Sequence, residues 1–263
     1  MHPTLFHLFG IRIDTYSVIW FIALSIAIIW VIKRLEIYEL DEYESRRVMA
    51  VSFFFMLIGA TLFKKIRMIP YMIENPSYLL NFFNWGISEF GAILGAFISA
   101  LVMCLFSRKV SFMKLCDAAT PPAILSIAIG RWGCFFNGCC VGITSKFFTA
   151  VHFPFDKIGV TRHPVQIYYS LIAFVIVGFL LLVERKILPL QKKKYYSVIA
   201  PLGMLCYALM RFSVAPVRER RSLLYMIQHY ERFTTYPAIA FALPFVLIWL
   251  IYSLYKLKSL SQE

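Results

Sequence analysis

Long apolar runs separated by short polar connectors dominate the chain. Seven of the runs are long enough to cross a bilayer as helices, which takes roughly 17–25 residues, and a helix satisfies its own backbone hydrogen bonds inside a membrane. They lie at about residues 16–32, 48–63, 85–106, 118–136, 164–183, 196–214 and 237–255. We therefore expect an all-α integral membrane protein. It should be a single polytopic domain over residues 1–263, a bundle of about seven transmembrane helices with a small external cap at 137–163.

Composition narrows the class of protein. Apolar residues make up 60% of the 263 positions and the mean hydropathy is +0.71, whereas average proteins are about 45–50% apolar. These values exclude a soluble enzyme and a disordered chain. The six cysteines fall mostly inside apolar runs, which is not the pattern of a secreted disulfide scaffold.

Lysine and arginine counts in alternate connectors predict the orientation. One set of connectors holds 14 of these residues and the other holds 11, and the richer set includes short connectors such as the one with Lys192, Lys193 and Lys194. Positive charge favours the cytoplasmic side, so we expect the N-terminus outside and the C-terminus in the cytoplasm. The net charge of +13 then suits anionic lipid head groups, and we expect no nucleic-acid partner.

Two arginines interrupt the apolar runs near the same predicted surface. Arg131 lies five residues before the end of the fourth run, and Arg211 lies three residues before the end of the sixth. With this orientation both side chains start about 5–8 Å below the outer interface. An arginine inside a span is costly unless paired, and two planar guanidinium groups suit a phosphate. The alternatives are that they extend to the lipid head groups or pair with Glu89 and Glu219.

Other polar side chains are expected at the same level. They are Tyr16, Glu89, Asn137, His163, Gln166, Tyr207 and Arg218. The opposite ends of the runs offer simple Lys and Arg anchors, and Asp117 there is typical of a helix N-terminal charge. A small lipid or solute transporter, the main alternative class, would instead place polar residues through the membrane midplane on broken helices.

Residues 130–138 read Gly-Arg-Trp-Gly-Cys-Phe-Phe-Asn-Gly, which resembles the signature of the prolipoprotein diacylglyceryl transferase family. The likeness extends along most of the chain. Tyr16 after Gly10-Ile11-Arg12 is similar to the entry of the family's first span, His163–Tyr168 is similar to its Pro-x-Gln-Leu-Tyr motif, and Tyr207–Phe212 is similar to the segment with its second essential arginine. Four short motifs in this order make the resemblance fairly specific.

The resemblance implies an enzyme of lipoprotein biosynthesis in the bacterial cytoplasmic (inner) membrane. Its lipid donor would be phosphatidylglycerol, its acceptor the lipobox cysteine thiol of a prolipoprotein signal peptide, and its leaving group glycerol phosphate. Arg131 and Arg211 would stabilise the departing phosphate, with Tyr16 and Tyr207 as further catalytic groups. The same resemblance assigns substrate binding to Arg131 and Arg211 and to three other residues. These are Asn137, Gln166 and Arg218. No metal or organic cofactor is implied.

Several positions depart from the family pattern. Phe90 stands where a histidine belongs, and Cys134 and Cys139 replace an asparagine and an acidic residue. With that histidine replaced, the candidate general bases are Glu89 and His163. A catalytically inactive relative that binds phospholipid or signal peptide is the remaining alternative.

Cys134, Cys139 and Cys140 form a C-x4-C-C pattern within the signature. Such a cluster can bind metal or supply a nucleophile, but no histidine is placed to complete a metal site. We therefore expect these residues to act as small apolar packing groups.

Overall fold

A computed structural model describes the chain at residues 4–8, 11–67, 73, 88–107, 109–191, 195–218 and 235–260. Contacts within these parts separate into two compact units. The first unit consists of Met1–Arg34, Cys116–Arg220 and Leu243–Glu263, and the second consists of Leu35–Leu115 and Arg221–Ala242. Of the site residues described below, Glu89 belongs to the second unit and the others belong to the first.

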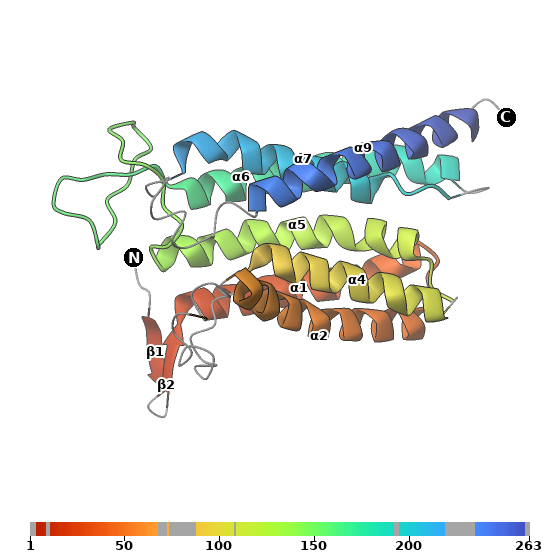
Figure 1. The fold of residues 1–263 in the computed structure, drawn as a ribbon, viewed down its shortest axis with the longest axis horizontal. Helices are drawn as coiled ribbons and strands as arrows, with labels where there is room; N and C mark the ends of the chain where they lie inside the picture. Colours follow the sequence, from red (N-terminus) through yellow and green to blue (C-terminus); the bar gives the residue numbers. More distant parts are fainter. Residues whose placement is uncertain are drawn as a thin grey trace. The chain divides into compact units, whose positions relative to one another are not determined.

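Long α-helices coincide with every predicted span (Figure 1). The described residues form α1 (Thr15–Ile37), α2 (Glu42–Arg67), α4 (Glu89–Ser107), α5 (Phe112–Phe136), α6 (Val165–Ile187), α7 (Ile199–Val214) and α9 (Thr235–Leu260). Within the described chain, five helices are apolar and long enough to cross a membrane, and α4 carries a shorter apolar stretch, Gly91–Ser107. The prediction of an all-α integral membrane protein is confirmed.

A short hairpin precedes the first helix and was missed by the sequence analysis. Strands β1 (Thr4–Leu8) and β2 (Ile11–Asp14) pair antiparallel, with Thr4 opposite Asp14 and Phe6 opposite Ile13. Strands of five and four residues are too short to give an apolar run of the length that marks a span. The hairpin leads directly into α1, so it fixes where Tyr16 lies.

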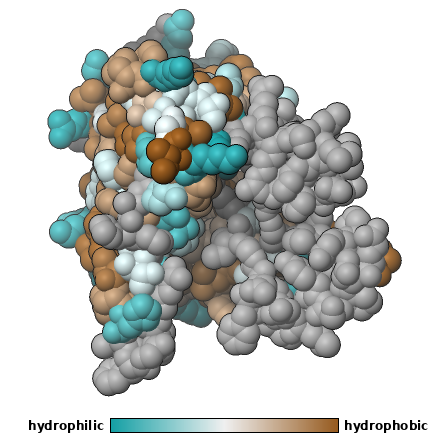
Figure 2. Space-filling model, turned by 90° about the vertical axis from the view of Figure 1, so that its left-hand side faces the viewer, coloured by the Kyte–Doolittle hydropathy of each residue, from teal (hydrophilic) through white to brown (hydrophobic). Residues whose placement is uncertain are grey.

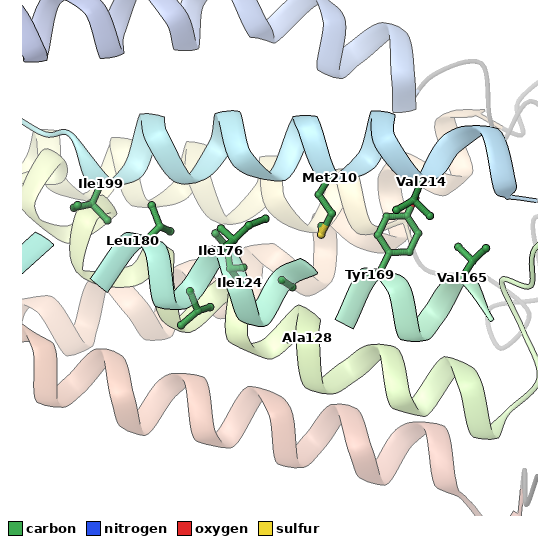
Figure 3. Close-up of a cluster of buried hydrophobic side chains, with 11 residues drawn as sticks. Ile124, Ala128, Val165, Tyr169, Ile176, Leu180, Ile199, Met210 and Val214 are labelled. Atoms are coloured by element: carbon green, nitrogen blue, oxygen red, sulfur yellow. The ribbon is translucent and has the colours of Figure 1, made fainter. Parts of the chain in front are cut away.

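The core of the first unit lies between α5, α6 and α7 (Figure 3). Helix α6 turns Tyr169, Ala173 and Leu180 toward this core, at intervals of helical periodicity. Its opposite face is also apolar and is exposed, for example at Leu171 and Val175. A helix that is apolar on all sides is typical of a membrane span, because lipid rather than water covers its outer face.

Helices α2 and α4 of the second unit approach each other at glycines. A Cβ added to Gly59 would lie 2.4 Å from the carbonyl oxygen of Gly91, and one added to Gly95 would lie 2.3 Å from the carbonyl oxygen of Phe55. Only residues without a side chain permit this backbone-to-backbone contact.

The end of the first unit opposite the signature holds a buried polar network. Arg34 donates to both carboxylate oxygens of Glu184, at 2.9 and 2.5 Å, and to the carbonyl oxygen of Ala118 at 2.8 Å. Both charged groups are buried. The expectation of simple anchors at these ends was wrong, because Arg34 is paired 150 positions away in the sequence.

Asp117 belongs to the same polar end. Within the described residues its carboxylate accepts hydrogen bonds from Tyr195 Oη, Ser197 Oγ and the backbone amides of Val198 and Ala200, at 2.6, 2.6, 3.1 and 2.7 Å. The prediction that Asp117 is a charge at the start of its own helix was wrong. The carboxylate caps the first turn of α7 instead, where amides lack partners inside the helix.

Candidate functional site

Arg131 of α5 and Arg211 of α7 meet over one aromatic ring. The guanidinium carbons lie 4.8 Å and 5.6 Å from the centroid of the Tyr169 ring. Each arginine is only 5% exposed and Tyr169 is 1% exposed. Figure 3 shows Tyr169 reaching from α6 toward α7. Three helices therefore bring two permanent positive charges to one place.

Tyr169 was not singled out from the sequence. A tyrosine in an apolar run is usually a packing residue, and part of its ring does belong to the core cluster. The available signal was its position, three residues after Gln166, which places both side chains on the same face of α6. Its ring supplies a negative face to the two guanidinium groups, which offsets part of the cost of burying them.

Glycines let the start of α1 pack closely on α5 beside Arg131. A Cβ at Gly130 would lie 2.6 Å from the Trp20 ring, and a Cβ at Gly133 would lie 3.2 Å from the carbonyl oxygen of Tyr16. The Tyr16 hydroxyl group is near enough to Arg131 to interact electrostatically with it. The structure thus brings Tyr16 to the arginine site.

Gln166 and Gly142 fix the turn that follows α5. The side-chain amide of Gln166 donates to the carbonyl oxygen of Cys139 at 2.6 Å, and Gln166 is buried. The Gly142 amide donates to the carbonyl oxygen of His163 at 3.0 Å. A Cβ at Gly142 would lie 2.7 Å from the carbonyl oxygens of both His163 and Val217. Only glycine fits between these two segments.

Arg218 follows α7 and pairs in a short antiparallel bridge with Gly142. Its positive charge interacts with the Cys140 thiol, as does that of Arg131. Asn137 is exposed in the turn after α5, where its backbone N–H donates to the carbonyl oxygen of Gly133 at 3.0 Å. Both residues lie at the same end of the first unit as Arg131.

His163 lies where the cap, residues 137–163, joins α6. Its Nδ1 atom is 3.0 Å from the Tyr168 hydroxyl oxygen, which is 2.6 Å from Oγ1 of Thr149. The cap is held together by an ion pair between Arg162 and Asp156 at 2.8 Å. Viewed from this end, hydrophobic and hydrophilic residues are intermixed on the surface (Figure 2).

The remaining two predicted site residues are Glu89 and Tyr207. Glu89 is the first residue of α4, but its side chain lies outside the described residues. Tyr207 is half-buried on α7 and packs against the hydrophobic core cluster.

The sulfur atoms of Cys134, Cys139 and Cys140 all lie within 4.8 Å of one another, and all three thiols are free. The pKa of the Cys140 thiol is held well below its ordinary value, first by hydrogen bonds with Cys134 and Cys139 and then by the positive charges of Arg218 and Arg131. The cluster is therefore part of the arginine site.

Comparisons with known proteins point to one family. The family model described as prolipoprotein diacylglyceryl transferase matches residues 3–253. The phosphatidylglycerol–prolipoprotein diacylglyceryl transferase of Clostridium novyi is 32% identical over 224 residues, which is 83% of this chain and 84% of the relative. That of Clostridium tetani is 33% identical over 189 residues (71% and 75%), and that of Finegoldia magna is 26% identical over 218 residues (83% and 84%). The chain belongs to the prolipoprotein diacylglyceryl transferase family.

Proposed function

We propose that this protein transfers a diacylglyceryl group from phosphatidylglycerol to the lipobox cysteine thiol of a prolipoprotein, with release of glycerol phosphate. The observation that carries the proposal is the buried pair of Arg131 and Arg211 over Tyr169. Family membership and the names of the relatives support the same reaction. Phosphatidylglycerol and the prolipoprotein signal peptide are accordingly the proposed substrates.

The arginine pair suits the charge that develops in this reaction. The acceptor thiolate attacks the glycerol carbon that bears the phosphate ester, a carbon–sulfur bond forms, and the carbon–oxygen bond breaks. The departing phosphate oxygen keeps the electron pair and becomes more negative. Guanidinium groups fixed in a site of low dielectric stabilise that charge without reorganising, and losing one such donor typically costs about 3–4 kcal/mol in the barrier. Tyr16, Gln166 and Arg218 at the same end of the first unit are the proposed residues that orient the head group.

The thiol must lose its proton before it attacks. Glu89 and His163 are the candidate proton acceptors from the sequence. The Nδ1 atom of His163 forms a hydrogen bond with the Tyr168 hydroxyl group, and this bond fixes the orientation of the imidazole ring. Glu89→Gln and His163→Gln variants separate the two assignments, because only the base variant should lose transfer while it still binds lipid.

A transporter fits the first unit less well. Its buried charged side chains in the described residues lie toward helix ends, at Arg131 and Arg211 or at Arg34, Asp117 and Glu184. The middle of α5–α7 is filled by the apolar cluster, whereas transport sites of broken-helix folds lie near the membrane midplane.

We further propose that the protein lies in the bacterial cytoplasmic membrane with the arginine site on the outer side. The distribution of lysine and arginine supports this orientation. A reporter inserted near Ile158 should be accessible from outside, and a reporter fused after Gln191 should be cytoplasmic. The reverse pattern would place the site on the cytoplasmic side and overturn the proposed orientation.

The decisive assay uses the purified protein in vesicles of phosphatidylglycerol with a lipobox peptide. Arg131→Lys and Arg211→Lys keep the charge but lose the two-pronged geometry, so each should slow transfer by about 10²–10³-fold. The double variant should be little worse than either single one, because both side chains serve one phosphate. Arg185→Lys, an exposed change at the other end of α6, is the matched control. Wild-type rates in Arg131→Lys would refute the proposed role, and fully additive losses would mean separate sites.

A further inference from the structure

The turn of the backbone after α5 brings three thiol groups close together. Gly138 and Cys140 both have a positive φ, 69° and 60°, and the Cys139 amide donates to the carbonyl oxygen of Cys134 at 3.1 Å. These features turn the chain back over the end of the helix. The three sulfur atoms consequently come within 4.8 Å of one another although Cys134 is five and six positions away from the others. A left-handed conformation at a residue other than glycine is unfavourable, and such strain concentrates at functional sites.

We propose that Cys134, Cys139 and Cys140 bind a zinc ion whose fourth position accepts the thiol of the prolipoprotein as a thiolate. This inference rests on the transferase activity proposed above and adds how the thiol is activated. Zinc in catalytic sites takes three protein ligands and keeps one position open for a substrate or water. The sequence places no histidine to complete a metal site, but three thiolates already form such a set.

The spacing of the sulfur atoms is close to what zinc requires. With zinc–sulfur bonds of about 2.3 Å in a tetrahedron, neighbouring sulfurs lie about 3.8 Å apart. The observed separations are at most 4.8 Å, so contraction by about 1 Å or less closes the site. Gln166 stabilises the turn through the 2.6 Å hydrogen bond that its side-chain amide donates to the Cys139 carbonyl oxygen. Partners of this kind, one step away from the metal, orient its ligands.

The surrounding charges suit a thiolate site. A zinc ion with three thiolates carries a net charge of about −1. Arg131 and Arg218 interact electrostatically with the cysteine cluster, so positive charge is already close by. Arg131 also belongs to the proposed phosphate site. The metal and the phosphate would therefore both lie near Arg131, which brings the nucleophile toward the leaving group.

In the proposed zinc site, the acceptor thiol loses its proton without a protein base. On coordination the acceptor thiol releases its proton to water, because a thiol bound to zinc is deprotonated. The bound sulfur then attacks the glycerol carbon, the carbon–oxygen bond breaks, and glycerol phosphate leaves with the electron pair. The thioether product is neutral and a weaker ligand, so it dissociates. No atom changes its oxidation state through an external oxidant or reductant, and neither Glu89 nor His163 has to accept the proton.

Metal binding is tested without reference to activity. The purified full-length protein, reduced and stripped with a chelator, is titrated with Cd²⁺ as a spectroscopic substitute for zinc. We expect one equivalent to bind with an ultraviolet thiolate-to-metal charge-transfer band. Cys139→Ser should lose the band, whereas Cys206→Ser, a half-buried thiol of α7 outside the cluster, should retain it. Absence of the band in wild-type protein, or an equal band in Cys139→Ser, would overturn the site.

Activity then separates this inference from the proposed function. Stripped protein should transfer lipid slowly and recover with added Zn²⁺, and Cys139→Ser should lose at least about 100-fold, since even outer partners of a metal site cost 10–100-fold. Full transfer by stripped protein would overturn the zinc inference and leave the transferase proposal standing. Stoichiometric Cd²⁺ binding without any transfer by zinc-loaded wild type would overturn the transferase proposal and leave the metal site standing. If Cys139→Ser does not fold, as judged by thermal unfolding, Cys140→Ser replaces it.

Discussion

Replacing Tyr169 with leucine tests whether the aromatic ring holds the two arginines in place. Leucine retains an apolar side chain at this buried position but removes the ring face. Both guanidinium carbons, at 4.8 and 5.6 Å from the ring centroid, lie within the range of about 6 Å over which this attraction acts. For desolvated groups each contact is worth about 1–2 kcal/mol, so the pair loses about 2–4 kcal/mol.

That loss should appear in catalysis. If the ring positions the arginines for the transition state, Tyr169→Leu should lower kcat/KM by about 30–1,000-fold, since about 1.4 kcal/mol corresponds to a factor of ten. Tyr169→Phe is the matched comparison, because it keeps the ring and removes only the hydroxyl group. Because Tyr169→Phe keeps the ring face near both arginines, its loss of kcat/KM should be much smaller than that of Tyr169→Leu.

The assay measures transfer to a lipobox peptide over a range of phosphatidylglycerol contents, at a temperature well below the unfolding transition of each variant. A positioning role predicts a lower kcat and a higher KM for phosphatidylglycerol. A structural defect that inactivates a minority of molecules would lower the apparent kcat and leave KM unchanged. Equal kcat/KM values for Tyr169→Leu and Tyr169→Phe would show that the ring face does not position the arginines.

Two other perturbations have clear expected outcomes. Arg34→Met leaves the buried carboxylate of Glu184 without this partner and should lower the free energy of unfolding by about 3–5 kcal/mol, measured by thermal unfolding in detergent. Replacing both residues with methionine should recover most of the loss. No recovery would contradict an ion-pair origin. Gly142→Ala should reduce both stability and lipid transfer, because the added methyl group has no room. Gly178→Ala should be neutral, because nothing lies within 4 Å of the added Cβ. Equal effects of the two changes would contradict the close contact at Gly142.

The helices and the arginine pair could be predicted from the sequence because the bilayer imposes simple rules. A span must be long and apolar, so each helix produces a run that is visible in the sequence. An arginine inside such a run is conspicuous because its burial is costly. Arg131 and Arg211 could thus be assigned to one level before any contact was known.

Other features could not be predicted because they depend on contacts that sequence spacing does not reveal. Arg34 and Glu184 are 150 positions apart, and both resemble ordinary residues at the ends of spans. Tyr169 has the same signal as any aromatic packing residue. The thiol cluster depends on the positive φ of Cys140, which a non-glycine residue rarely adopts and which no local pattern announces.

The hydrogen bonds of Asp117 have a consequence for the order of biosynthesis. Tyr195, the first of its partners to be synthesised, is 78 positions further along the chain. At about 5–20 residues per second, the ribosome takes roughly 4–16 s to reach it. During that time α5 carries a carboxyl group whose partners do not yet exist, so the nascent protein cannot complete this end of the bundle. Helix formation takes about 0.1–1 μs, so translation sets the earliest time at which this end of the first unit can form.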